Sequence, residues 1–238
     1  MAIEGSHQRP AAATPAHATL NNALSFDYYM NSCPQLEQIV HNKIMQWIKR
    51  DRTLAPALIR LHFHDCAVRA IEADHTVPIG RESVTRLINF FQSNGLNVLD
   101  LVVLSGAHTI GRSTCESLQF RLSNYNGTRK PDPTINRHYR NLLRRKCKKA
   151  SDYVNLDGVT PNAFDVQYYT NLEKKMGVLL TDQLLYSDRR TEPLVAVLAS
   201  QPSVFEPQFA ASMVKLGNIL DHFNNGEVRL NCERINTY

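Results

Sequence analysis

Apolar residues recur along this chain mostly at intervals of three and four. In the segment from Pro207 to Leu220, residues Phe209, Met213 and Leu216 fall on one face of a helix. Few segments alternate with a period of two, the pattern of a strand. Helical spacing also predicts helices at Pro34–Arg50, Leu54–Cys66, Glu82–Ser93, Asn136–Lys149, Asn162–Lys175 and Pro193–Ala199, with an apolar run at Leu99–Leu104. We therefore expect a mainly α fold with at most short strands.

Composition is that of a globular protein. The chain has 238 residues, 43% of them hydrophobic, which is enough for one sizeable core. Its formal net charge of +5 is a mild basic bias that does not argue for a nucleic-acid partner. No apolar run is long enough to span a bilayer, so we expect no membrane partner.

One cluster of basic residues stands out, at Arg144–Lys149, where five of six residues are Lys or Arg. We interpret it as a solvated helix end. A polyanion-binding site is the alternative.

The N-terminal residues 1–23 are expected to form a flexible tail. The stretch Ala11–Ala18 is rich in Ala and Pro, and the first nineteen residues contain no apolar h-region. No signal peptide is therefore recognisable in this chain. Residues 24–238 are expected to form a single domain.

The five cysteines are widely spaced, and no two of them form a CxxC pair. This spacing suits structural disulfides better than zinc, and the odd number leaves at least one thiol without a partner in the chain. Asn126-Gly127-Thr128 is an N-glycosylation sequon in a polar loop, with Asn126 as the acceptor. Together these features favour a secretory history.

Two short segments carry candidate chemistry: Arg60–Cys66, which reads RLHFHDC, and Ser105–Gly111, which reads SGAHTIG. Arg60 and His64 are four residues apart and therefore share one face of a helix. Heterolytic cleavage of a peroxide needs such a pair. A base moves a proton between the two oxygens, and a fixed cation stabilises the charge on the departing one.

Taken together, the two segments resemble those of the class III, secretory plant-type haem peroxidases, and the resemblance covers Leu24 to Tyr238. It implies the plant haem-peroxidase fold with haem b as cofactor. The implied reaction is reduction of hydrogen peroxide at ferric haem with one-electron oxidation of small phenolic donors. It also implies a monomer exported to the cell wall or vacuole.

The resemblance assigns roles to individual residues. Arg60 and His64 would be catalytic, and Phe63 would line the haem pocket. His108 would be the axial ligand of the haem iron, and Asp182 would accept a hydrogen bond from its other ring nitrogen. Cys115 and Cys147 would form a disulfide. Cys33, Cys66 and Cys232 would lack their usual partners.

Two calcium sites are implied in the same way. The proximal site would take oxygen ligands from Thr109, Asp157, Thr160, Ala163 and Asp165, a set that suits a hard cation. The alternative is a polar loop that caps the helix starting near Asn162. The distal site would use Asp65 and Val68, but Ala70–Ala73 stands where the family's further ligands begin.

Compared with the family, several dozen residues are missing between Arg69 and Glu82. The distal part of the domain, about residues 24–81, is therefore expected to be truncated, whereas the proximal part, about residues 82–238, is complete. The losses include an asparagine that orients the distal histidine and a strip where donors dock. A truncated haem-binding pseudoenzyme is thus the alternative function.

A zinc- or polyanion-binding module is a third hypothesis, built from the histidines and cysteine of the first segment and the basic residues 144–149. The pattern His62-x-His64-x-Cys66 on one helix cannot direct all three side chains at one ion. This hypothesis is therefore the weakest of the three.

Overall fold

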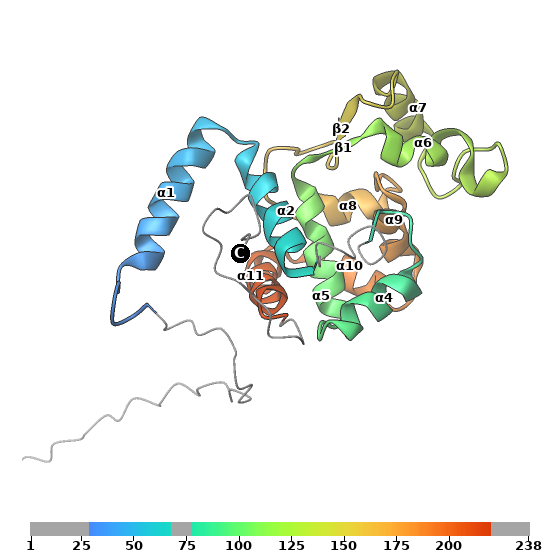
Figure 1. Ribbon diagram of the computed structural model, residues 1–238. Helices are drawn as coiled ribbons and strands as arrows, with labels where there is room; N and C mark the ends of the chain where they lie inside the picture. Colours follow the sequence, from blue (N-terminus) through green and yellow to red (C-terminus); the bar gives the residue numbers. More distant parts are fainter. Residues whose placement is uncertain (1–28, 68–77, 220–238) are drawn as a thin grey trace, which may run out of the picture.

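The computed structural model describes residues 29–67 and 78–219, with residues 64–67 described by their backbone alone. The described part is mainly helical, as predicted (Figure 1). The helices are α1 Leu36–Arg50, α2 Leu54–Ala67, α4 Val84–Ser93, α5 Val98–Ser105, η1 Gly106–Thr109, α6 Cys115–Ser123, η2 Tyr125–Gly127, α7 Arg137–Lys146, α8 Gln167–Glu173, α9 Leu180–Ser187, α10 Glu192–Ser200 and α11 Pro202–Gly217. The strands β1 Arg112–Thr114 and β2 Tyr153–Asn155 form an antiparallel pair.

Two of the predicted helices are shorter than expected by more than two residues. Helix α7 ends at Lys146 because the backbone N–H groups of Lys148 and Lys149 donate to the Asp152 carboxylate, at 2.8 and 2.7 Å, which turns the chain away. Helix α8 begins at Gln167 instead of Asn162 because the preceding residues form a polar loop around two aspartates.

The last helix is longer than the apolar pattern indicated. Helix α11 begins five residues before the predicted start, because Pro202 occupies its first turn, where a missing N–H costs nothing. Pro207 lies inside the helix and does not start it. Helices α6 and α9 were not predicted at all, because their apolar stripes are short.

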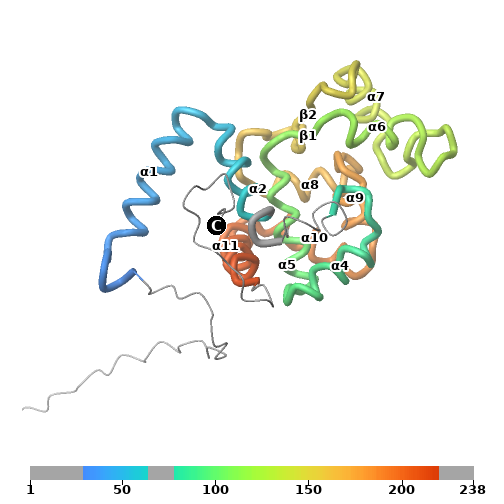
Figure 2. Tube along the Cα trace, viewed as in Figure 1, coloured from blue at the N-terminus to red at the C-terminus, as the bar shows by residue number. Residues whose placement is uncertain are grey.

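The main core lies among α4, α5, α8, α10 and α11. Helix α5 is its most buried element, and Leu101, Val102 and Val103 are almost completely enclosed. Figure 2 shows α5 between α4 and α11. Since Phe164, Tyr169, Phe205 and Phe209 also meet here, aromatic side chains fill much of this core.

A second, smaller core joins α6, α7 and β2, and includes Leu118, Leu122 and Leu143. The disulfide between Cys115 and Cys147 links the start of α6 to the end of α7, which confirms the predicted pair. In Figure 1 this unit lies to one side of the main core. We call it the α6–α7 lobe, residues 112–155.

Helix α1 is not covered by the rest of the described chain. It contacts α2 but has no buried residue, and it lies apart from the main core in Figure 1. Ile39, Val40 and Trp47 on this helix are exposed, at 55%, 45% and 46%. The apolar stripe that predicted this helix therefore has no counterpart to pack against within the described residues.

Within the described part, no single helix is long and apolar enough to cross a membrane. The only combination that passes on length and composition is a pair of segments, Val84–Ser93 with Val98–Thr109, bent by 110°.

The difference in burial between the main core and α1 predicts that truncating a side chain in the core lowers the free energy of unfolding more than truncating one on α1. Phe205→Ala should lower the free energy of unfolding by about 3–5 kcal/mol, because it opens a cavity in a close-packed core. Trp47→Ala should lower it by about 1 kcal/mol or less, because the side chain is half exposed. Guanidinium titrations followed by far-UV circular dichroism measure both values. Equal losses would show that α1 is packed in solution.

Candidate active site

His108 lies in η1, the short 3-10 turn that follows α5. Glycines on both sides let the chain make this turn. A Cβ atom at Gly106 would lie 2.3 Å from the Tyr169 hydroxyl and 2.6 Å from Phe205, so no larger residue fits. Gly111 has a φ of +93°, a conformation that favours glycine. The bracketing glycines seen in the sequence thus set the path of the backbone around His108.

The structure brings His108 together with Asp182, from the first turn of α9. His108 Nδ1 and Asp182 Oδ1 are 2.8 Å apart, and the aspartate side chain is only 2% exposed. Asp182 accepts two further hydrogen bonds, from the Tyr168 hydroxyl at 3.1 Å and from the Leu179 backbone N–H at 2.9 Å. A buried carboxylate is thus satisfied by donors from three elements.

These contacts determine which nitrogen of His108 is available. A carboxylate only accepts hydrogen bonds, so Nδ1 carries the proton and donates it to Asp182. Within the described residues Nε2 makes no hydrogen bond, and the side chain is 34% exposed. In its neutral form the imidazole therefore presents an unshared lone pair at Nε2, as a metal ligand needs.

The charge of Asp182 also shifts the pKa values of its neighbours. Burial by itself lowers the pKa of His108, but the charge of Asp182 and its hydrogen bond outweigh burial, and the net shift is upward. Burial and the same carboxylate raise the pKa of Tyr168 well above its usual value. Tyr168 therefore keeps its proton and remains a donor to Asp182.

Arg121 supports the loop in front of Asp182, a role that sequence reasoning missed. Its guanidinium donates to the backbone oxygens of Gly177, Val178 and Leu179 at 2.6, 2.7 and 2.8 Å. It also pairs with Asp132 at 2.7 Å, with both side chains completely buried. The available signal was an arginine between Leu118 and Leu122 on the apolar side of α6.

The predicted distal residues lie on α2. Arg60 is exposed, and Phe63 is half-buried against the main core. The side chain of His64 lies outside the described residues. His62 Nε2 lies 3.2 Å from the backbone oxygen of Met213, which ties α2 to α11. The helix keeps Arg60 and His64 one turn apart, as their spacing predicts.

The five predicted proximal calcium ligands converge. Thr109 Oγ1 lies 3.1 Å from Asp165 Oδ1 and 3.4 Å from the backbone oxygen of Ala163. Thr160 Oγ1 lies 3.1 Å from Asp165 Oδ1 and 3.3 Å from Asp157 Oδ2. Oxygens that are distant in the sequence thus surround one point between η1 and the loop before α8.

This oxygen set suits a hard cation. Asp157 is fully buried and its Oδ1 accepts hydrogen bonds from the backbone N–H groups of Val159 and Thr160 and from the Asn171 amide, but neither Asp157 nor Asp165 forms an ion pair with a Lys or Arg of residues 29–67 or 78–219. Buried carboxylates are normally paired or bound to a metal. Residues 29–67 and 78–219 contain no cluster of three His, Cys, Asp or Glu side chains that could hold a metal ion. Beside the two aspartates, this set contains the hydroxyl groups of Thr109 and Thr160 and the backbone oxygen of Ala163, which are ligands that calcium accepts.

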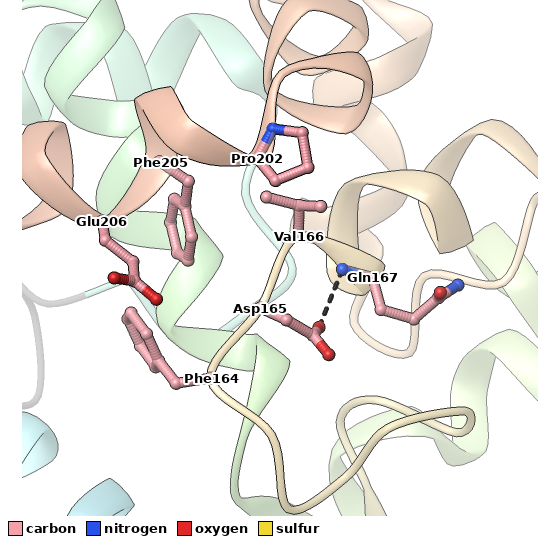
Figure 3. Close-up of a pocket in the computed structure, with 7 residues that line it drawn as sticks. All are labelled: Phe164, Asp165, Val166, Gln167, Pro202, Phe205 and Glu206. Atoms are coloured by element: carbon pink, nitrogen blue, oxygen red, sulfur yellow. Dashed lines mark hydrogen bonds between the residues drawn. The ribbon is translucent and has the colours of Figure 1, made fainter.

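A groove of about 280 Å³ adjoins this set (Figure 3). It is lined by residues 164–167, together with Pro202, Phe205 and Glu206 of α11. In Figure 3, Asp165 accepts a hydrogen bond from the Gln167 backbone N–H, at 2.9 Å, where α8 begins. The carboxylate is therefore held in place by the start of a helix.

The remaining predicted sites are placed only in part. The Asp65 side chain and Val68, the distal calcium candidates, lie outside the described residues, as do the Cys66 side chain, Cys232 and the tail 1–23. Cys33 forms no disulfide within the described residues. Asn126 of the sequon is exposed in η2 and is accessible to modification.

Comparison with known proteins agrees with this site. The family profile described as "Peroxidase" matches residues 69–201. Peroxidase 7 of Arabidopsis thaliana is 39% identical over 300 aligned positions, covering 92% of this chain and 86% of that protein. Peroxidase 22 of the same plant is 32% identical, covering 91% and 88%. The chain belongs to the plant peroxidase family, whose members are oxidoreductases.

The alignment also shows that the chain is shortened relative to these proteins. Because 92% of 238 residues is about 219, roughly 80 of the 300 aligned positions have no counterpart here. The uncovered face of α1 is consistent with such a loss.

Arg121→Met should lower the free energy of unfolding by about 3–5 kcal/mol, because it leaves the buried Asp132 carboxylate without its cation and three backbone oxygens without the guanidinium. The matched control is Arg190→Met, since the Arg190–Asp188 pair is exposed and should cost about 1 kcal/mol or less. Denaturant titration gives both values. A loss for Arg121→Met as small as that of the control would contradict the support proposed for the 177–179 loop.

Proposed function

We propose that this protein is a haem peroxidase that reduces hydrogen peroxide and oxidises small phenolic donors. The observation that carries the proposal is the hydrogen bond between His108 and the buried Asp182 carboxylate, which leaves the imidazole Nε2 without a hydrogen bond among the described residues. Peroxide accepts two electrons and two protons to give two water molecules, and two phenols each supply one electron and one proton. Haem b would supply the iron at which these electrons are exchanged.

Each residue of the site has a distinct part in this proposal. His108 Nε2 would bind the iron, and Asp182 would strengthen the electron donation of the imidazole by accepting the Nδ1 proton. His64 would take a proton from one peroxide oxygen and return it to the other, while the guanidinium of Arg60 would stabilise the departing oxygen. Phe63 would shape the haem pocket.

Calcium bound by Thr109, Asp157, Thr160, Ala163 and Asp165 would support this arrangement. Thr109 directly follows His108, and the other four residues come from the loop before α8. A cation at their centre would hold η1 against this loop and thereby fix the position of His108. The disulfide and the exposed sequon also favour export from the cell, to the cell wall or vacuole.

A second function, a haem-binding pseudoenzyme with little turnover, is favoured by the shortening. We expect the missing positions to lie in the distal part, where peroxide would be activated, and α1, which belongs to that part, has no buried residue. The proximal part, which would bind the iron, is well packed. Haem binding without turnover is the result that would select this alternative.

Reconstitution with haemin tests the axial assignment. The wild-type chain should take up one haem and show a Soret band with the signature of histidine ligation. His108→Ala should abolish that signature, because the nitrogen ligand is removed. His138→Ala on the exposed side of α7 is the control and should leave the spectrum unchanged.

Unchanged ligation in His108→Ala would refute the axial role. Turnover of peroxide with a phenolic donor should then be measured on the reconstituted chain. Arg60→Leu should reduce it by about 10²-fold or more if the guanidinium stabilises the departing oxygen.

Removal of calcium should destabilise the protein. With Ca²⁺ at 100 times its dissociation constant, binding to the native state should add about 2.7 kcal/mol to the free energy of unfolding, and EDTA should remove it. Asp157→Asn and Asp165→Asn should each weaken this effect, whereas Asp188→Asn, on the exposed ion pair, should not. Melting curves with and without EDTA provide the measurement, and calcium-independent melting of the wild-type chain would refute the site.

A further inference from the structure

Positive charge is concentrated in one part of this chain. Residues 112–153 contain eleven Lys and Arg against three Asp and Glu, a net charge of +8. The other residues contain 16 Lys and Arg against 19 Asp and Glu, a net charge of −3. The overall charge of +5 therefore arises entirely from the α6–α7 lobe.

Helix α7 presents much of this charge to solvent. Tyr139 and Leu143 face the small core, so the residues on the opposite side point outward. Arg137, Arg144 and Arg145 lie on that outward side and are exposed. Lys148 and Lys149, just beyond the helix, are also exposed. We call these five residues the basic stripe.

The basic stripe is not explained by internal pairing. None of its side chains forms an ion pair with any residue of 29–67 or 78–219, and only Arg144 makes a side-chain hydrogen bond there, to the backbone oxygen of Leu122. Favourable interaction with the helix dipole accounts for Arg144 and Arg145 in the last turn. It disfavours a cation at Arg137, the first residue of α7.

A groove of about 420 Å³ runs along the same helix. The polar residues that line it are Asn136, His138, Asn141 and Arg145, and the apolar ones include Leu142 and Met176. The side chains of His138 and Asn141 make no hydrogen bond within the described residues. The groove thus offers an amide, an imidazole and a guanidinium next to a row of cations, a combination that suits hydroxyl groups as well as acidic groups.

A polysaccharide fits this surface better than a nucleic acid. Proteins that bind single strands stack bases on exposed aromatic rings. Tyr139 of α7 is only 7% exposed, and Tyr153 of β2, which is 55% exposed, already carries the Arg112 guanidinium over its ring, 4.7 Å from the centroid. The Cys115–Cys147 disulfide closes the end of the same helix and marks an oxidising compartment. The sequon at Asn126 lies in the same lobe.

We propose that the basic stripe and its groove bind an acidic polysaccharide built of uronic acid units. The carboxylates pair with Arg137, Arg145 and the two lysines, while sugar hydroxyls bond to His138 and Asn141 in the groove. Arg137 and Arg145 are eight residues apart, which places them about 12 Å apart along the axis of α7 at 1.5 Å per residue, with the Asn141 amide on the turn between them. This binding does not depend on haem or on the proposed reaction.

The test uses the full-length chain and polygalacturonate, with neutral dextran and single-stranded RNA as comparison ligands. One variant carries Arg137→Gln, Arg145→Gln, Lys148→Gln and Lys149→Gln. The control carries Lys49→Gln, Arg52→Gln, Lys174→Gln and Arg189→Gln, which removes the same charge from exposed positions elsewhere. Affinity is measured at low salt by a direct titration such as calorimetry.

We expect polygalacturonate binding that weakens with salt, and no binding of dextran. The stripe variant should lose about tenfold or more in affinity, and the control less than about threefold. Asn141→Leu, which leaves the charge unchanged, should lose about threefold by removing an amide from the groove. Equal losses in the stripe variant and its control, tighter binding of RNA, or no binding of polygalacturonate would each overturn the proposal.

Discussion

The candidate active site depends on a single buried carboxylate, that of Asp182. Burying a charge is costly unless it is matched, and Asp182 is matched by His108 from η1, Tyr168 from α8 and the Leu179 N–H at the start of α9. The same three bonds fix the orientation of His108 and the position of its proton. Arg121 then holds the 177–179 loop from the α6–α7 lobe, so both cores contribute to the geometry of one imidazole.

Packing quality differs between the two parts of the protein. The part that carries His108, Asp182 and the oxygen set is tightly enclosed, and helix α5 and its aromatic neighbours leave room only for glycine at position 106. The part that begins with α1 exposes apolar residues such as Ile39 and Trp47. The packing therefore supports the proposed iron binding at His108 more strongly than the proposed activation of peroxide beside α2. Haem uptake and turnover must accordingly be measured separately.

The α6–α7 lobe serves two purposes in this view. Its interior carries Arg121, which faces the active site, and its exterior carries the basic stripe, which faces solvent. The disulfide and the small core fix the position of α7, which carries the basic stripe, relative to α6, which carries Arg121. A ligand on the outside would therefore anchor the protein without occupying the site, and the enzyme could work on small donors while attached to an acidic polymer.

The sequence by itself determined the helical class and most helix positions, because a helix and a glycine-bracketed turn depend on neighbours in the chain. The Cys115–Cys147 pair and the residues that converge around Asp182 and the oxygen set were predicted from the resemblance of two motifs to a known family. Only the tertiary structure revealed Arg121 beneath the 177–179 loop, Tyr168 on Asp182 and His62 on the Met213 oxygen. Each of these contacts joins distant segments, and so does the late start of α8, whose predicted first turn is instead a loop around Asp165. Such contacts depend on how the helices pack, and a one-dimensional pattern does not contain that arrangement.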